Sequence, residues 1–273
     1  MKAKNLFFIC VILLFSGSVL TCSNSGDQDP YIKKMEKNKG NVFHGRSYGN
    51  KFLPDTPYGY ELWSEIADVS DGNKNRLIWY GPKYGGGGAF RAEWNNAKVF
   101  LGRVGLFWNA GKPYSHYNNT FCDFKFTRSE NGTAGYTSYI GVYGWSKSPM
   151  IEWYIVEDWF EPGAIGPVRI GGNAEKMGEF TVDGSVYFIY KAVRPAGVGN
   201  ILGVYEPFPQ FFSVRQNTRQ SGTISVSEHF KEWEKAGLKL GTNMYEAKFL
   251  VEAGSGSGWL DVSRLSFYQK QEK

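Results

Sequence analysis

Two glutamates in strand-like segments are the groups most suited to chemistry. Glu152 lies in "MIEWYIVED" and Glu252 in "YEAKFLVEA". A carboxylate buried without a partner is costly, so each must be solvated, paired or put to use. Hydrolysis of a glycosidic bond needs two carboxyl groups: one protonates the leaving oxygen, and the other attacks the sugar or activates water. Either glutamate alone is an ordinary strand residue, and only the pair suggests this chemistry.

Alternation along the two segments predicts which side chains share a face, because successive strand residues point to opposite sides. In the second segment one face is apolar: Ala247, Phe249 and Val251. The opposite face carries Glu252 with two more charged residues, so we expect it to line a wet or functional surface. In the first segment Glu152 shares a face with Tyr154, whose phenol can hydrogen-bond a carboxylate.

The elements that must position these residues read as short strands. Aromatic residues make up 17% of the chain, which also holds 34 glycines, and this composition is typical of strands and turns. Alternating runs such as "TFCDFKF" are separated by clusters of Gly, Asn, Asp, Ser or Pro, and the Asp-Gly of "FTVDGSVYFIY" predicts a hairpin turn. The spacing indicates an all-β antiparallel sandwich rather than alternating strands and helices.

One short helix is expected at "SEHFKEWEKAGLKLG". Phe230 and Trp233 are spaced to share a helix face. Ser225 and Glu228 match a capping box, and Gly237 is placed to end the helix.

The N-terminal region reads as a targeting segment and a spacer. Residues 1–21 pair two lysines with an apolar run, as in a secretion signal. "SVLTCS" resembles a bacterial lipobox, with Thr21 in place of the usual Gly or Ala, so Cys22 is a candidate for lipidation and plain secretion is the alternative. The polar composition of residues 22–57 predicts a linker, and the strand-like runs over residues 58–268 predict a single domain. We expect a secreted or cell-envelope protein that meets a membrane only through this lipid.

Charge, cysteine and histidine patterns argue against several other classes. The net charge of +5 reflects the N-terminal region, since acidic and basic residues balance from Phe52 onward, and a nucleic-acid partner is not expected. After processing only Cys122 would remain, so no internal disulfide is expected, and its strand position suggests a small buried hydrophobe. His44, His116 and His229 lack metal-ligand spacing, so no metal is expected.

Several motifs together carry a resemblance to a known family. "YGWSKSPMIEWYIVEDW" resembles the nucleophile strand of the endo-β-1,4-xylanases of glycoside hydrolase family eleven. "RAEWNNAKVFLGRVG", "QFFSVRQ" and the segment from "HFKEWEKAGLKLG" through "VEAGSGSG" resemble further family motifs in the same order. The resemblance covers about Tyr58 to Tyr268. It implies a jelly roll of two twisted antiparallel sheets with one short helix and a concave cleft, and no cofactor.

The resemblance also implies site residues. Glu152 matches the nucleophile and Glu252 the general acid/base. The residues matched to substrate binding are Tyr143, Tyr154, Arg194, Gln210 and Trp63, the last as an aromatic platform for a distal xylose. We expect Arg194 and two phenols to hold the pKa of Glu152 low, and the neighbouring negative charge to raise that of Glu252.

The chain departs from the family pattern at three places. The loop "PAGVGNILGVYEPFPQ" replaces the usual thumb tip. Glu246 stands where an aromatic is usual, and Val99, or Lys98 with a slip of one, stands where the family carries an Asp or Asn beside the acid/base.

Three functions remain open from the sequence. The first is a retaining endo-1,4-β-xylanase, expected as a monomer, that cuts xylan internally. The second is a xylan-binding module that has lost turnover. The third is a β-glucanase on the same fold.

Overall fold

The protein is described by a computed structural model in which two sheets carry almost all of the regular structure. It covers residues 29–49, 52–65, 75–108, 110–135, 137–160 and 173–270. The smaller sheet has six strands in the order β1 (Asn41–His44), β4 (Arg76–Trp79), β5 (Phe90–Ala97), β15 (Gly256–Gln269), β7 (Thr120–Arg128) and β13 (Ser221–Ile224). The predicted all-β jelly-roll sandwich is confirmed.

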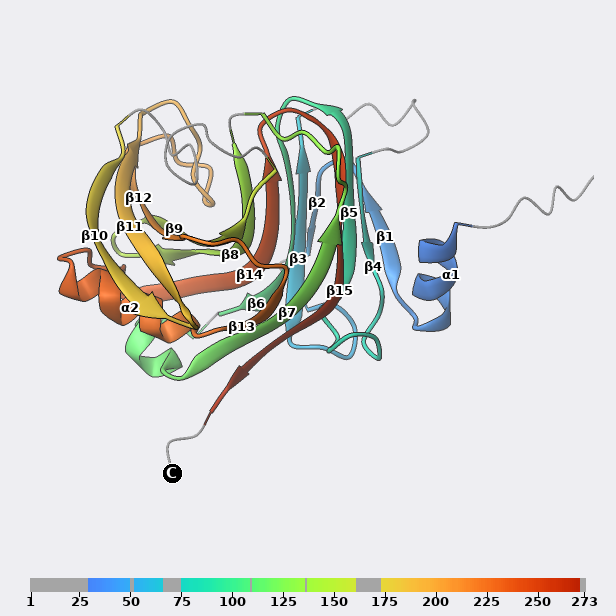
Figure 1. The fold of residues 1–273 in the computed structure, drawn as a ribbon, viewed down its shortest axis with the longest axis horizontal. Helices are drawn as coiled ribbons and strands as arrows, with labels where there is room; N and C mark the ends of the chain where they lie inside the picture. The colour runs from blue at the N-terminus through green and yellow to red at the C-terminus, as the bar shows by residue number, and fades with distance from the viewer. Residues whose placement is uncertain are drawn as a thin grey trace, which may run out of the picture.

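The larger sheet has nine strands and curls strongly (Figure 1). Their order is β10 (Glu175–Val182), β11 (Ser185–Arg194), β12 (Phe208–Arg215), β9 (Ile151–Asp158), β8 (Ser138–Lys147), β14 (Asn243–Ala253), β6 (Phe100–Phe107), β3 (Tyr58–Ser64) and β2 (Ser47–Gly49). Within the described residues, all paired strands are antiparallel except β12 and β9. The predicted hairpin joins β10 to β11.

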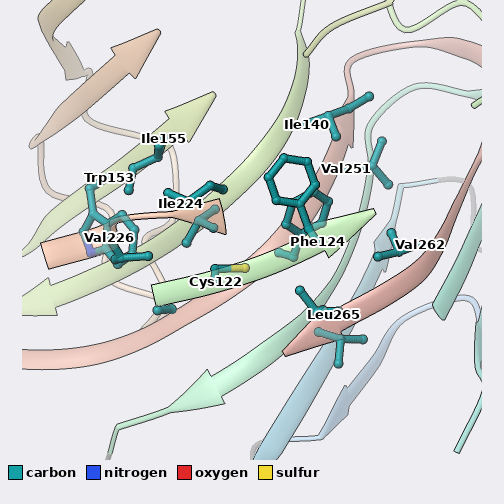
Figure 2. Packing of buried hydrophobic residues seen from close by; sticks show 14 of the residues in the cluster. Cys122, Phe124, Ile140, Trp153, Ile155, Ile224, Val226, Val251, Val262 and Leu265 are labelled. Atoms are coloured by element: carbon teal, nitrogen blue, oxygen red, sulfur yellow. The ribbon is translucent and has the colours of Figure 1, made fainter. Parts of the chain in front are cut away.

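An aromatic-rich core fills the space between the sheets. Trp153 of β9 and Phe249 of β14 both point into it, as alternation predicts; the Phe249 ring stacks on Phe124 of β7, and the Trp153 ring packs against Phe230. Cys122 lies among these side chains (Figure 2). Its thiol is free and buried, and burial raises its pKa, so the interpretation as a small hydrophobe is confirmed.

The predicted helix is α2 (Val226–Lys235). Phe230 and Trp233 are buried on its inner face, and Gly237, with φ of 80°, follows its last turn. The predicted capping box is absent, because the hydroxyl of Ser225 donates to Asp183 instead of capping the helix. A 3-10 turn, η1 (Tyr114–Tyr117), packs against α2.

The expectation of a linker over residues 22–57 is wrong for residues 30–49. These form α1 (Pro30–Lys37), β1 and β2, and the two strands extend opposite sheets by pairing with β4 and β3. Figure 1 shows α1 beside β1 and β4. The segments that form β1 and β2 are short and mix polar with apolar residues, so their sequence shows no sustained alternation. Each nevertheless forms an edge strand of its sheet. Residues 1–21 and Cys22 lie outside the described residues, and no helix within the described part is long and apolar enough to cross a membrane.

Candidate active site

Strand register brings the two glutamates to one face of the nine-stranded sheet. Glu152 on β9 faces Trp145 on β8 and Gln210 on β12. Glu252 on β14 faces Tyr139, which shares the parity of Trp145 on β8. Side chains that face each other across a ladder lie on the same side of the sheet. We call this side, turned away from the core, the site face.

Three hydrogen-bond donors surround the carboxylate of Glu152. Its side chain is only 7% exposed. The phenols of Tyr143 and Tyr154 donate to Oε1 at 2.7 and 3.0 Å, and the amide of Gln210 donates to Oε2. The parallel pairing of β12 with β9 places Gln210 there. Because three donors favour the ionised form, the carboxylate is suited to act as a nucleophile.

One hydroxyl connects the two glutamates. The phenol oxygen of Tyr154 lies 3.0 Å from Oε1 of Glu152 and 3.2 Å from Oε2 of Glu252. These oxygens are therefore about 6 Å apart at most, which suits the short carboxyl spacing of retaining glycosidases better than the wider one of inverting enzymes. Residues a hundred positions apart meet here, as the sequence predicted.

Electrostatics separate the roles of the two carboxyl groups. Burial raises the pKa of Glu252 to about 7, and the negative charge of Glu152 adds to the shift. Burial also raises the pKa of Glu152, although Tyr143, Gln210, Arg194 and Tyr154 all act to lower it. The expected low pKa for Glu152 is thus wrong, and burial, rather than the neighbouring charge, is the main cause at Glu252. Both corrections arise because the sequence did not show how completely the site is buried.

Two predicted substrate-binding residues lie farther out. Arg194 ends β11 with an exposed side chain, and among the described residues it makes no hydrogen bond to Glu152. Its charge nevertheless lowers the pKa of that carboxyl. Trp63 on β3 faces Leu101, which in turn faces Glu252, so it lies two strands from the acid. The guanidinium of Arg46 stacks over the Trp63 ring at 4.3 Å.

Sequence reasoning missed a buried charge cluster beside the glutamates. Arg103 on β6 donates to Glu246 at 2.5 Å and to Glu61, and the ammonium of Lys248 lies 2.8 Å from Glu246. The Arg103 guanidinium stacks on the Tyr143 ring at 4.4 Å. We name Arg103, Glu61, Glu246 and Lys248 the ion cluster. Alternation placed Glu246 and Lys248 on the site face, but nothing local in the sequence pointed to Arg103 as their partner.

Trp145 is a second residue that the sequence analysis did not single out. Its indole donates to the Tyr143 hydroxyl at 2.5 Å, so the oxygen that donates to Glu152 is itself held in place. The "YGW" motif contained both residues and was the available signal.

The two departures from the family pattern other than Glu246 can also be located. Val99 is half-buried between β5 and β6, and its apolar side chain cannot hydrogen-bond Glu252; among the described residues the one side-chain hydrogen bond of Glu252 is with Tyr154. In the loop 195–207 the Asn200 side chain accepts from the amides of Leu202 and Val204, and Ile201 packs against the aromatic cluster of the site face.

No metal site accompanies the two glutamates in the described part of the chain, where no group of three or more His, Cys, Asp or Glu could hold an ion. Of the three histidines, His116 is exposed and His229 is fully buried in the core.

Comparisons with known proteins give the same picture as the geometry. The chain is 40% identical over 257 residues to endo-1,4-beta-xylanase C of Fibrobacter succinogenes, which covers 93% of this chain and 38% of that protein. It is 35% identical over 220 residues to endo-1,4-beta-xylanase A of Bacillus pumilus, covering 80% and 85%. The chain thus spans well under half of the Fibrobacter relative and most of the Bacillus one.

A solved structure agrees with the architecture. The crystal structure of a mutant of ENZbleach xylanase matches with a TM-score of 0.76 and 49% identity, covering 85% of this chain and 88% of that one. The profile of the glycosyl hydrolases family 11 matches residues 71–263, which include both glutamates and the residues that contact them. The chain therefore belongs to the glycosyl hydrolases family 11.

Proposed function

We propose that the chain is a retaining endo-1,4-β-xylanase whose site face binds xylan. The observation that carries this proposal is the Tyr154 hydroxyl, which lies within hydrogen-bond distance of both Glu152 and Glu252. The xylanase names of the relatives support the choice of substrate. We assign residues 58–268 as the catalytic domain, together with the strands that residues 41–49 add to its sheets.

In the first step of this mechanism Glu152 attacks the anomeric carbon. The bond to the leaving oxygen breaks as Glu252 transfers its proton to that oxygen, and a covalent glycosyl-enzyme forms. A pKa of about 7 keeps Glu252 protonated in mildly acidic solution, as the step needs. Tyr143, Tyr154 and Gln210 hold the attacking carboxylate in a fixed orientation.

In the second step water replaces the enzyme on the sugar. Glu252, now ionised, accepts a proton from the water, whose oxygen bonds the anomeric carbon and releases Glu152. The two displacements retain the anomeric configuration. Arg194 and Trp63 are proposed to contact the bound sugars, since β11 and β3 each lie two strands outward from a glutamate strand, at opposite sides of the pair.

The test is reducing-sugar release from linear xylan, arabinoxylan and barley β-glucan. We expect cleavage of both xylans, and loss of at least about a thousandfold in kcat for Glu152→Gln and Glu252→Gln. Wild-type turnover in either variant would refute the assigned roles. Retention of the chain in xylan gels without sugar release would instead identify a binding module, and preferential cleavage of barley glucan a β-glucanase.

We also propose that residues 1–21 direct export and that Cys22 becomes lipidated. The motif "SVLTCS" supports this, and plain secretion is the alternative. Labelled fatty acid incorporated into the wild type but not into Cys22→Ser would support the lipid anchor. Equal labelling of the two chains would refute it.

A further inference from the structure

We propose that Arg46 forms a binding site for the carboxylate of a uronic acid side group on xylan, at the Trp63 end of the site face. The inference rests on the proposed xylanase function and names the decorated polymer that this site would favour. Nothing in the sequence singled out Arg46, which lies in the region expected to be a spacer.

Register places Arg46 beside Trp63. Ser47 at the start of β2 faces Leu62, so the preceding residue is aligned with Trp63 on the site face. The Arg46 guanidinium lies 4.3 Å from the centre of the Trp63 ring, and its Nε donates to the carbonyl of Ser64 at 3.1 Å. Stacking and this bond both restrain the guanidinium plane, which is the arrangement that suits a recognition residue.

The position is one that a bound polysaccharide can reach. One row of facing residues runs across the site face through Glu252, Leu101 and Trp63 to Arg46. Neighbouring strands are about 4.8 Å apart, so Trp63 is about 10 Å and Arg46 about 14 Å from Glu252. A short run of sugars that starts at the reacting bond and rests on Trp63 would carry its next side group past Arg46.

The charge of Arg46 is available to a ligand. Its side chain is exposed, and within the described residues no carboxylate forms an ion pair with it. Two carboxylates, Glu61 and Glu65, are equally near in register. Glu61 is held by Arg103 in the ion cluster, and Glu65 is exposed and forms no ion pair with Arg46 in the described part of the chain. Nε is engaged by Ser64, and the two terminal nitrogens have no hydrogen-bond partner among the residues that the structure describes, so they form a pair of donors that matches a carboxylate.

The charges of the xylan backbone and of its side groups indicate which group Arg46 would bind. The xylose backbone is neutral and gains nothing specific from a cation. Glucuronic acid side groups supply a carboxylate on the same polymer, and arabinose side groups do not. The alternative is that Arg46 only packs on Trp63, and that role would affect charged and neutral polymers equally.

The experiment measures binding by gel retardation in the full chain carrying Glu152→Gln, so that no polymer is consumed. Three polymers are compared: linear xylan, glucuronoxylan, and glucuronoxylan whose carboxyls have been reduced to alcohols. We expect Arg46→Gln to weaken binding of glucuronoxylan about three- to tenfold. It should leave the reduced polymer and linear xylan unchanged. Arg46→Lys should keep part of the preference, and added salt should diminish it.

Two controls complete the design. Arg264→Gln removes another exposed arginine, on β15 of the other sheet, and should change nothing at the site face. Equal weakening on all three polymers, or no change on glucuronoxylan, would overturn the inference. Sugar release from linear xylan by the chain without Glu152→Gln separately tests the proposed function, so the two can fail independently.

Discussion

Tyr154 and Glu252 meet on the site face at 3.2 Å, and the same phenol lies 3.0 Å from Glu152. A phenol carries one proton and can donate to only one of these carboxyl groups at a time. All three groups are satisfied when Tyr154 donates to Glu152 and a protonated Glu252 donates to the phenol oxygen. This arrangement is the protonation state that the first catalytic step needs, so Tyr154 links the ionised nucleophile to the neutral acid.

Replacing this phenol should impair catalysis more than folding. In Tyr154→Phe, Glu152 loses a donor that lowers its pKa, so the acidic limb of kcat/KM should move to higher pH. We expect kcat to fall about ten- to a hundredfold. Tyr190→Phe is the control: Tyr190 lies on β11, two strands from Tyr154, and within the described residues it makes no hydrogen bond to either glutamate, so this variant should keep both rate and profile. An unchanged acidic limb would contradict the role given to Tyr154.

The pH dependence of the wild type should be bell-shaped. Glu252 must carry its proton, and its pKa is about 7, so kcat/KM should decline as the pH rises through about 7. Glu152 must be ionised, so activity should also decline on the acid side, at a pH set by its raised pKa. Initial rates on linear xylan across the pH range give both limbs. Full activity well above pH 7 would be inconsistent with Glu252 as the acid.

The charge of Glu152 should be visible in the titration of its neighbour. That charge raises the pKa of Glu252, so Glu152→Gln should lower it. Carbon NMR of labelled glutamate side chains measures the change directly. Because burial is the larger cause, the pKa should stay above the usual value for a glutamate. A pKa that stays near 7 in the variant would show that the two groups are not coupled.

The ion cluster should be essential to stability. Arg103→Met leaves Glu246 and Glu61 without their shared cation in a buried site, and a loss of about 3–5 kcal/mol in the free energy of unfolding is expected. Lys231→Met removes an exposed pair with Glu228 on α2 and should cost no more than about 1 kcal/mol. Denaturant unfolding compares the two. If the two variants lost similar amounts of unfolding free energy, the ion cluster would contribute little to stability.

His229 should make the protein sensitive to acid. It is fully buried, and burial, together with the charges of Arg219 and Arg215, lowers its pKa to about 3. Between this value and about 6.5 the unfolded chain binds a proton that the folded chain does not, so stability falls as the pH is lowered through this range. At pH 5 the penalty is about 2 kcal/mol.

Substitution at this site separates the histidine from other titrating groups. Between pH 7 and pH 4 the free energy of unfolding of His229→Phe should fall less than that of the wild type. This holds even if the substitution changes the stability by the same amount at every pH. His116→Gln, at an exposed position, should leave the slope as in the wild type. Parallel slopes for wild type and His229→Phe would contradict the prediction.

The sequence by itself determined the strands, their faces and the two glutamates. Successive residues of a strand point to opposite faces, and this alternation can be followed from adjacent residues in the sequence. It was therefore enough to assign Phe249 to the core face and Glu252 to the site face. The family motifs supplied the partners Tyr143, Tyr154 and Gln210. The α2 helix followed from its apolar spacing and from Gly237, although its capping residue bonds elsewhere.

Only the tertiary structure decided how deeply the site is buried and which distant charges meet there. Burial depends on the curl of the nine-stranded sheet, so the raised pKa of Glu152 could not be inferred from its nearest residues. Arg103 and Glu246 are 143 positions apart and meet because β6 pairs with β14. Arg46 likewise reaches Trp63 through the pairing of β2 with β3. Such contacts are set by strand order, which no local pattern encodes.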